Sequence, residues 1–203
     1  MSPVFKRVVR KIRRFSIKRK IKKSIGNSPI NLEIGAGDRK GKIGWITIDI
    51  DENADISWDL KFGIPLNNNS VKKIYSSHFM EHLTYKEGQV LLDECLRVLV
   101  SGGVFSVCVP NSKIYIEAYA NDHVLDDKQF FRYEKGFNNT TKIDYVNYCA
   151  YMGGAHKYMF DQENLLFILI NKGFENVRPR SFDPSMDRKD RDFESIYAEA
   201  TKP

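Results

Sequence analysis

Short apolar runs alternate with longer amphipathic segments from residue 29 to the end of the chain, and this alternation constrains the fold more than any other feature. The apolar runs predict strands over residues 30–34, 45–50, 54–60, 73–77, 104–109, 174–177 and 195–200. The segments between the early runs predict crossover helices, which connect parallel strands. We therefore expect an α/β fold with a doubly wound, mostly parallel seven-stranded sheet that binds its ligands at the carboxyl ends of the strands.

Capping signals set the expected limits of two helices. Thr84 and Glu87 have the spacing of a capping box before an apolar helical stripe, and the glycine pair at 102–103 is expected to end that helix. Asp161 predicts the start of a second helix, which covers residues 165–171 and stops at the glycine that follows.

Residues 111–160 interrupt the alternation after the fifth predicted strand. This stretch is polar and weakly periodic, and its aromatic side chains include Tyr115, Tyr119, Phe130, Phe131, Tyr133, Phe137, Tyr145, Tyr148 and Tyr151. An insertion of this length at the ligand-binding edge of a sheet is either a functional lid or a partly ordered loop. We favour the lid.

The positive charge of the chain is concentrated at its N-terminus. Residues 1–25 contain eleven of the 32 lysines and arginines and no acidic residue. The remaining 21 basic residues are outnumbered by 26 acidic ones, so the rest of the chain carries a net charge of about −5. We therefore separate a basic segment with its linker, residues 1–28, from one folded domain, residues 29–203.

The apolar residues of this basic segment recur at intervals of three and four, as in a helix. They are Phe5, Val8, Val9, Ile12 and Phe15, and they predict an amphipathic helix with cations around the remaining faces. Such a helix is expected to bind an anionic membrane surface, where each lysine or arginine adds about 1 kcal/mol. Nucleic-acid phosphates, a targeting role and an inert extension are the alternatives.

The sequence also indicates a compartment. It has no run of about 18 apolar residues to span a bilayer, and its N-terminus lacks the apolar stretch of a secretory signal. The three cysteines, Cys95, Cys108 and Cys149, form neither an even set nor a metal-binding pair. We expect a cytoplasmic protein, peripheral at the inner face of the membrane if the basic helix binds lipid, and we assign no metal site.

Two glycines, Gly35 and Gly37, follow the first predicted strand and let a ligand approach the backbone without a Cβ in the way. The pattern departs from the dinucleotide fingerprint, because the position that needs a third small residue holds Lys40. Asp49 also follows the glycines too closely to be the acidic residue of that fingerprint. A nucleoside with a cationic amino-acid tail fits better, since Asp49 can accept both ribose hydroxyls and Asp59 an exocyclic amine.

These residues belong to an ordered series of motifs. The series comprises LEIGAGD at 32–38, GWITIDID at 44–51, DL at 59–60, IYSSHFMEHL at 74–83, LRVLVSGG at 96–103 and VPN at 109–111. In this order and spacing the motifs resemble the class I S-adenosylmethionine-dependent methyltransferases, particularly the small enzymes often associated with surface-polysaccharide biosynthesis. The resemblance covers roughly residues 30–203, and it implies a Rossmann-like fold, S-adenosylmethionine as cofactor and residues 111–160 as a lid on the acceptor side.

The resemblance also implies which residues contact the cofactor. They are Glu33, Gly35, Gly37, Asp49, Ile50, Asp59, Leu60 and Ser76. Asp49 would hold the ribose, Asp59 and Leu60 would flank the adenine, and Ser76 would line the sulfonium end. The family's long first helix does not fit into the short segment before Trp45, so part of the cofactor wall is expected to be a loop.

Methyl transfer to a hydroxyl requires positioning of the acceptor and a base for its proton. His78, at the end of the fourth predicted strand, is our first choice for this base, and His156 is the second. The other two histidines, His82 and His123, fit better as a backbone-bonded helix start and a solvated loop.

The leading hypothesis is a methyltransferase for a polar acceptor, either a small molecule or a sugar hydroxyl of a membrane-associated glycan. The aromatic insertion would stack on sugar rings, and the basic helix would bring the enzyme to the membrane. A nucleic-acid methyltransferase with a basic tail is an alternative that the acidic body of the chain disfavours. A cofactor-binding module without transfer activity is the third possibility.

Overall fold

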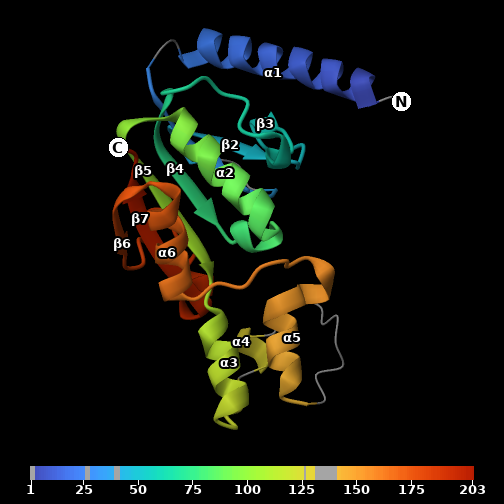
Figure 1. Cartoon of the computed structure of the whole chain (residues 1–203), viewed down its shortest axis with the longest axis vertical. Helices are drawn as coiled ribbons and strands as arrows, with labels where there is room; N and C mark the ends of the chain where they lie inside the picture. The colour runs from blue at the N-terminus through green and yellow to red at the C-terminus, as the bar shows by residue number, and fades with distance from the viewer. Residues whose placement is uncertain (1–2, 26–27, 39–41, 126, 131–140) are drawn as a thin grey trace.

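Seven strands form one mixed sheet at the centre of the molecule (Figure 1). The computed structural model describes residues 3–25, 28–38, 42–125, 127–130 and 141–203. The strands are β1 (Ile30–Ile34), β2 (Trp45–Asp49), β3 (Ile56–Ser57), β4 (Val71–Ser77), β5 (Leu99–Pro110), β6 (Glu175–Pro179) and β7 (Ser195–Thr201), in the order β3-β2-β1-β4-β5-β7-β6. Strands β1 to β5 pair in parallel, whereas β7 is antiparallel to β5 and β6. This arrangement confirms the predicted α/β fold and its mostly parallel sheet.

Helices and an irregular segment cover the two faces of the sheet. The helices are α1 (Pro3–Ile25), α2 (Tyr85–Val98), α3 (Ser112–Ala120), α4 (Asp127–Phe130), α5 (Ile143–Tyr151) and α6 (Gln162–Lys172), and the short 3-10 helices are η1 (Leu60–Phe62), η2 (Met80–His82), η3 (Met152–Gly154) and η4 (Lys189–Glu194). On the face of α2 and α6, Ile74 and Leu165 belong to one buried apolar cluster. Tyr75 points to the opposite face, because side chains alternate along a strand. Its hydroxyl donates to Asp187, so residues 180–194 cover part of that face.

The predicted capping signals set the starts of α2 and α6. The Thr84 hydroxyl accepts the backbone N–H of Glu87, and the Glu87 carboxylate accepts that of Thr84, which completes the capping box. Asp161 caps α6, and Gly173 ends it in the left-handed conformation with a φ of +94°. These local signals are therefore confirmed.

The prediction that residues 102–103 end α2 is wrong. α2 ends at Val98, and β5 follows directly with no intervening loop. The glycine pair lies inside β5, where the register between β4 and β5 shifts. Glycine fits this irregular stretch, because a Cβ on Gly103 would come within 2.8 Å of the Val100 carbonyl oxygen.

The predicted third strand is also shorter than expected. Of residues 54–60, only β3 is extended and paired with β2. Asp59 instead caps η1, where its carboxylate accepts the backbone N–H of Lys61 at 3.0 Å. The apolar residues of this stretch, Trp58 and Leu60, are buried in the core although they are not part of a strand.

The insertion after β5 is helical and has a small apolar core of its own. Tyr115 of α3 is buried with Tyr148 and Cys149 of α5. The predicted lid aromatics that lie outside the described residues are Phe131, Tyr133 and Phe137. In Figure 1 the insertion occupies the end of the molecule opposite α1.

The basic N-terminal segment forms α1, as predicted, and contacts the domain through arginines. Arg13 donates to the Ser57 carbonyl at 2.7 Å, and Arg14 donates to the Ile64 carbonyl at 2.8 Å and pairs with Glu94 at 3.3 Å. The apolar stripe faces away, with exposed fractions of 42–71% for Phe5, Val8, Val9, Ile12 and Phe15. None of the described helices combines the length and apolar character that crossing a membrane requires.

Candidate functional site

A cavity of about 480 Å³ lies at the carboxyl ends of β2 and β3, where a sheet of this kind binds its ligands. We call it the strand-end cavity; its walls include Asp49, Ile50, Trp58, Asp59, Leu60, Phe79, His82 and Lys157. Its volume is in the range of small-molecule sites. The structure therefore brings four of the predicted cofactor-binding residues, Asp49, Ile50, Asp59 and Leu60, to one cavity.

Backbone donors fix the Asp49 carboxylate at the end of β2. Its Oδ2 accepts the N–H of Gly37 at 2.9 Å, and its Oδ1 accepts the N–H of Asp51 at 3.0 Å. Each carboxylate oxygen can accept a further hydrogen bond, so Asp49 is oriented without being saturated. The Trp58 N–H donates to the Asp49 carbonyl at 2.6 Å, which brings the neighbouring Asp59 to the same edge of the sheet.

The two glycines after β1 have different structural roles. Gly35 has a φ of +69°, and a Cβ there would lie 2.1 Å from Cγ of Phe79, so the packing of this ring itself requires glycine. Gly37 has a φ of +64°, and among the described residues no atom beyond its own chain neighbours lies within 4 Å of the position of its missing Cβ. A ligand can therefore approach the backbone at Gly37, whereas Gly35 supports Phe79 in the cavity wall.

Two other predicted cofactor contacts, Glu33 and Ser76, are buried in the sheet and do not line the strand-end cavity. Ser76 is fully buried on β4, and its hydroxyl has no hydrogen-bond partner among the described residues. Strand pleating explains this position, because Ser76 lies on the same face of β4 as Ile74, toward the core. The structure thus places neither side chain in the wall of the strand-end cavity, and their contact with a cofactor stays a prediction.

A second cavity, of about 190 Å³, adjoins the strand-end cavity through His82, which lines both. We call it the histidine cavity; its walls include His78, Glu81, Tyr115, Tyr148, His156, Arg191 and Glu194. It lies between η2, the insertion and η4. Both histidines predicted to be catalytic therefore line this cavity, although His78 follows β4 and His156 lies near the end of the insertion.

His78 is held by a chain of hydrogen bonds. It follows β4 with a φ of 49°, and its Nε2 lies 2.8 Å from Oγ of Ser195. The Ser195 hydroxyl donates to the Arg191 carbonyl at 2.6 Å, so Ser195 is left to accept from Nε2–H. The unprotonated Nδ1 then lies 3.6 Å from Oε1 of Glu81. Burial, with a further contribution from Arg191, lowers the pKa of His78 well below its usual value.

Glu81, His82 and His156 form a compact cluster whose ligand atoms all lie within 4.8 Å of one another. Nδ1 of His82 lies 3.1 Å from the Ala155 carbonyl oxygen, and Nδ1 of His156 lies 2.8 Å from that of Cys149. The Glu81 side chain is 2% exposed, and its Oε2 has no hydrogen-bond partner in the described part of the chain. Burial raises the pKa of Glu81 to about 8 and lowers the pKa of both histidines.

Backbone hydrogen bonds join the end of the insertion to η2. The Glu81 carbonyl accepts the N–H of Lys157 at 2.8 Å and that of Tyr158 at 3.3 Å. Because His156 directly precedes these two residues, the bonds place its ring beside Glu81 and His82. The two imidazoles meet edge to face, with ring centroids 5.0 Å apart.

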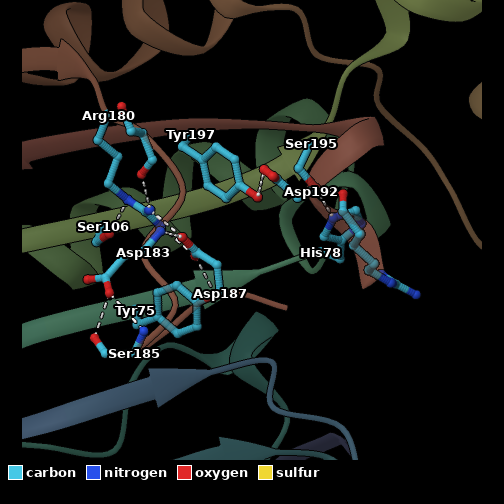
Figure 2. A network of polar contacts seen from close by, with 12 residues as sticks. Tyr75, His78, Ser106, Arg180, Asp183, Ser185, Asp187, Asp192, Ser195 and Tyr197 are labelled. Carbon is cyan, nitrogen blue, oxygen red and sulfur yellow. Dashed lines mark hydrogen bonds and ion pairs between the residues drawn. The ribbon is translucent and has the colours of Figure 1, made fainter. Parts of the chain in front are cut away.

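A buried polar network fixes residues 180–194 to the sheet (Figure 2). Both terminal nitrogens of Arg180 bind the Asp187 carboxylate, at 2.5 and 2.7 Å, and its Nε donates to Ser106 of β5 at 2.9 Å. Figure 2 places this network beside Ser195 and its histidine partner. The network thus anchors residues 180–194 to the sheet. This segment contains η4, which contributes Arg191 and Glu194 to the wall of the histidine cavity.

The sequence alone does not predict several residues of the two cavities. His82 bonds to a backbone carbonyl as expected, but it ends η2 instead of starting a helix, and its partner is the distant Ala155. Its ring also lines both cavities. Glu81 is adjacent to His82, yet nothing local indicates that His156 completes the group. Arg191 and Glu194 come from η4, for which the sequence offers no motif.

By sequence, the chain matches no protein-family model and no curated protein. Its structure is similar to those of solved S-adenosylmethionine-dependent methyltransferases. One from Archaeoglobus fulgidus is 16% identical, with a TM-score of 0.54 over 93% of this chain and 94% of that one. One from Methanosarcina mazei is 16% identical, with a TM-score of 0.54 over 90% and 96% of the two chains. One from Aquifex aeolicus is 14% identical, with a TM-score of 0.51 over 92% and 89%. These similarities establish the Rossmann-like fold.

Proposed function

We propose that this chain is an S-adenosylmethionine-dependent methyltransferase that acts on a polar acceptor. The observation that carries the proposal is the pair of adjoining cavities: the strand-end cavity for the cofactor and the histidine cavity for the acceptor, with His82 at their boundary. Methyl transfer needs this arrangement, because the donor and the acceptor must meet at bonding distance. The fold shared with solved methyltransferases supports the same function.

The strand-end cavity offers groups suited to each part of S-adenosylmethionine. In this proposal Asp49 accepts the ribose hydroxyls, while Asp59 and Leu60 flank the adenine. Gly37 would let the amino-acid tail approach the backbone, and Phe79 would form part of the wall. A methyl donor bound there would supply its methyl group to an acceptor in the adjoining histidine cavity, which His78 lines.

The reaction that we propose is an in-line displacement. The acceptor hydroxyl gives its proton to the unprotonated Nδ1 of His78 as its oxygen attacks the methyl carbon. The new C–O bond forms while the C–S bond breaks, and the electron pair remains on sulfur to give S-adenosylhomocysteine. His156 is the second candidate for the group that takes the proton.

The histidine cavity favours the end of a polar molecule as acceptor. Its volume of about 190 Å³ admits one small ring or polar head group, and Tyr115, Tyr148 and Glu194 combine aromatic surface with polar atoms. A sugar hydroxyl fits this chemistry. We propose that the acceptor sugar belongs to a membrane-associated glycan, as in surface-polysaccharide biosynthesis. The alternative is that the acceptor hydroxyl belongs to a free small molecule. Transfer of labelled methyl groups to lipid-linked glycans and to free sugars separates the two.

Calorimetric titration with S-adenosylmethionine and S-adenosylhomocysteine tests the cofactor site. Wild-type protein should bind both, and Asp49→Ala should bind about 100-fold more weakly, because two hydrogen bonds to a carboxylate are worth about 1.5 kcal/mol each. Glu52→Ala is the matched control, since Glu52 is an exposed carboxylate three residues away. Binding of neither ligand to folded wild-type protein would contradict the proposal, as would equal affinity of the Asp49→Ala variant.

We further propose that α1 attaches the enzyme to an anionic membrane surface, at the cytoplasmic face. Arg13 and Arg14 hold it to the domain, while the apolar stripe and the side chains of Arg7, Lys11 and Arg19 are exposed. The histidine cavity borders the insertion, at the opposite end of the molecule (Figure 1). A membrane-linked acceptor must therefore extend into the aqueous phase to reach it.

Vesicle co-sedimentation tests this attachment with a matched pair of variants. Phe15→Asp and Ser16→Asp each add one negative charge at an exposed position of α1 and so lower its net charge equally, but only the first removes apolar area. Binding to phosphatidylglycerol vesicles should weaken about tenfold more for Phe15→Asp, because burying one large apolar side chain contributes about 1.5–3 kcal/mol. Equal loss in both variants, or stronger binding to a polynucleotide than to vesicles, would contradict the membrane proposal.

A further inference from the structure

We infer that Glu81, His82 and His156 form a binding site for a divalent transition-metal ion at the boundary of the two cavities. Each side chain offers one ligand atom, and the three atoms lie within 4.8 Å of one another. A four-coordinate ion with ligand distances of about 2.0–2.1 Å needs separations of about 3.4 Å. The ligand atoms must therefore approach one another by up to about 1.4 Å, and the 39% exposed ring of His82 has room to move.

The hydrogen bonds of the two imidazoles prepare them as ligands. Both donate Nδ1–H to a backbone carbonyl, His82 to Ala155 and His156 to Cys149, so the Nε2 atoms carry the lone pairs. A carbonyl that accepts the second ring N–H is the usual support for a metal-bound histidine, because it fixes both the tautomer and the ring direction. The two rings thus present unprotonated nitrogens to the same region.

The third ligand, Glu81, is a buried carboxyl with one unused oxygen. Its side chain is 2% exposed, and Oε2 has no hydrogen-bond partner among the described residues, although buried polar atoms normally have one. In the described part of the chain no lysine or arginine lies within ion-pair distance of Glu81, although the charge of Arg191 acts on its pKa from farther away; the groups within that distance are His78 and His82. A cation bound at this point would supply the missing partner.

The donor set selects the class of ion. Two imidazole nitrogens and one carboxylate oxygen suit Zn²⁺, Co²⁺ or Fe²⁺, whereas Mg²⁺ and Ca²⁺ prefer an all-oxygen environment. Cys149 lines the same cavity, but its thiol donates to Ser112 at 3.3 Å, and burial raises its pKa to about 11. The thiol is therefore not counted as a ligand.

The role of this ion rests on the proposed function, whereas its binding does not. Three protein ligands would leave a coordination position open, as in catalytic zinc sites, and all three side chains line the histidine cavity. An acceptor oxygen bound there would lose its proton more readily. His156 would then be a ligand and no longer a candidate base, which leaves His78 as the group that takes the proton.

Titration of tag-free, metal-stripped full chain with Zn²⁺ and Co²⁺ tests the inference. We expect one tight equivalent, with a Co²⁺ absorption band typical of four or five ligands. Glu81→Gln and His156→Gln should each weaken binding by about 100-fold, because each removes one of three ligands. The matched control is His123→Gln, since His123 lies on an exposed stretch after α3 and should leave the affinity within twofold; Cys149→Ser should do the same.

Each outcome decides the inference. Wild-type affinity no higher than that of Glu81→Gln would overturn it, and so would loss of binding in His123→Gln or displacement of Co²⁺ by equimolar Mg²⁺. The same metal-free preparations are titrated with S-adenosylmethionine. Metal binding without cofactor binding would contradict only the proposed function, and cofactor binding without metal binding would contradict only the metal site.

Discussion

Two buried carboxylates of this protein, Asp187 and Glu81, differ in how completely their oxygens are satisfied. Asp187 accepts hydrogen bonds from both terminal nitrogens of Arg180, from the Tyr75 hydroxyl and from the backbone N–H of Asp183. Glu81 is as deeply buried, yet Oε2 has no hydrogen-bond partner among the described residues. The protein thus contains one carboxylate that is built into the fold and one that is held ready for a ligand.

This difference in hydrogen bonding distinguishes a structural carboxylate, Asp187, from a proposed ligand-binding one, Glu81, without a comparison with related proteins. A satisfied buried ion pair holds its neighbours in place, and removing one partner leaves the other charge stranded. An unsatisfied buried group costs free energy in the folded state, and a cation bound at Glu81 would offset that cost. Amide substitutions of the two carboxylates, which preserve their shape, test the contrast directly.

Asp187→Asn should give the largest effect. The substitution leaves the Arg180 guanidinium buried and without its anion, so we expect the free energy of unfolding to fall by about 3–5 kcal/mol. Urea denaturation followed by circular dichroism measures this change. Asp190→Asn is the control, because its ion pair with Arg188 is exposed and should contribute less than about 1 kcal/mol.

Glu87→Ala should have an intermediate effect, because Glu87 is satisfied but partly exposed. It closes the capping box of α2, and its loss should cost about 1 kcal/mol at pH 7. The Thr84 backbone N–H and hydroxyl, together with Lys61, lower the pKa of Glu87 from 4.5 to about 2.

The pH dependence of this effect has a definite sign. A carboxyl whose pKa is lowered by folding stabilises the folded state above pH 4.5 and loses that contribution as the pH falls through about 2. The stability difference between wild type and Glu87→Ala should therefore shrink over this window in urea titrations. A difference that stays constant from pH 7 to pH 2.5 would show that the helix cap does not depend on the charge.

Glu81→Gln should change the stability of metal-free protein by less than about 1 kcal/mol. The amide has nearly the shape of the carboxyl, and no hydrogen bond to Oε2 is lost among the described residues. Urea denaturation in the presence of a chelator measures the free energy of unfolding of this variant, for comparison with that of Asp187→Asn. A loss as large as that of Asp187→Asn would place Glu81 among the structural groups and remove the contrast.

Ser76→Ala should have the smallest effect, within about 0.5 kcal/mol. The buried hydroxyl of Ser76 has no hydrogen-bond partner among the described residues, so its removal sacrifices no bond. Affinity for S-adenosylmethionine should also stay within twofold, because Ser76 does not line the strand-end cavity. A tenfold loss in calorimetry would instead restore the cofactor contact that the sequence predicts.

Features encoded by neighbouring residues were the ones that the sequence predicted well. Thr84 with Glu87, and Asp161, marked the helix starts, and strand periodicity indicated the sheet. Asp49 could be placed at the cavity because it ends a strand, and strand ends of this fold meet at one edge. The predicted end of α2 at the glycine pair was wrong, because an irregular strand and a helix end can both require glycine.

Features that depend on contacts across the fold could not be predicted in the same way. The sequence pattern suggests that Gly35 binds a ligand, yet glycine is required there because a Cβ would collide with the ring of Phe79. Glu33 and Ser76 belong to strands near the site, but the pleat turns them into the interior. The metal-ligating group unites η2 with the end of the insertion, and no local pattern predicts that meeting.

The insertion leaves the sheet and returns to it at almost the same point. Asn111 forms a bridge with Phe160, and the Ser112 N–H donates to the Phe160 carbonyl at 2.9 Å. A segment whose two ends are already joined can be lengthened, shortened or exchanged at little cost to the surrounding fold. The insertion, which lines part of the histidine cavity, can therefore diversify in evolution while the sheet and the strand-end cavity stay constant. Under the proposed function, replacing this one segment would be enough to change the substrate preference.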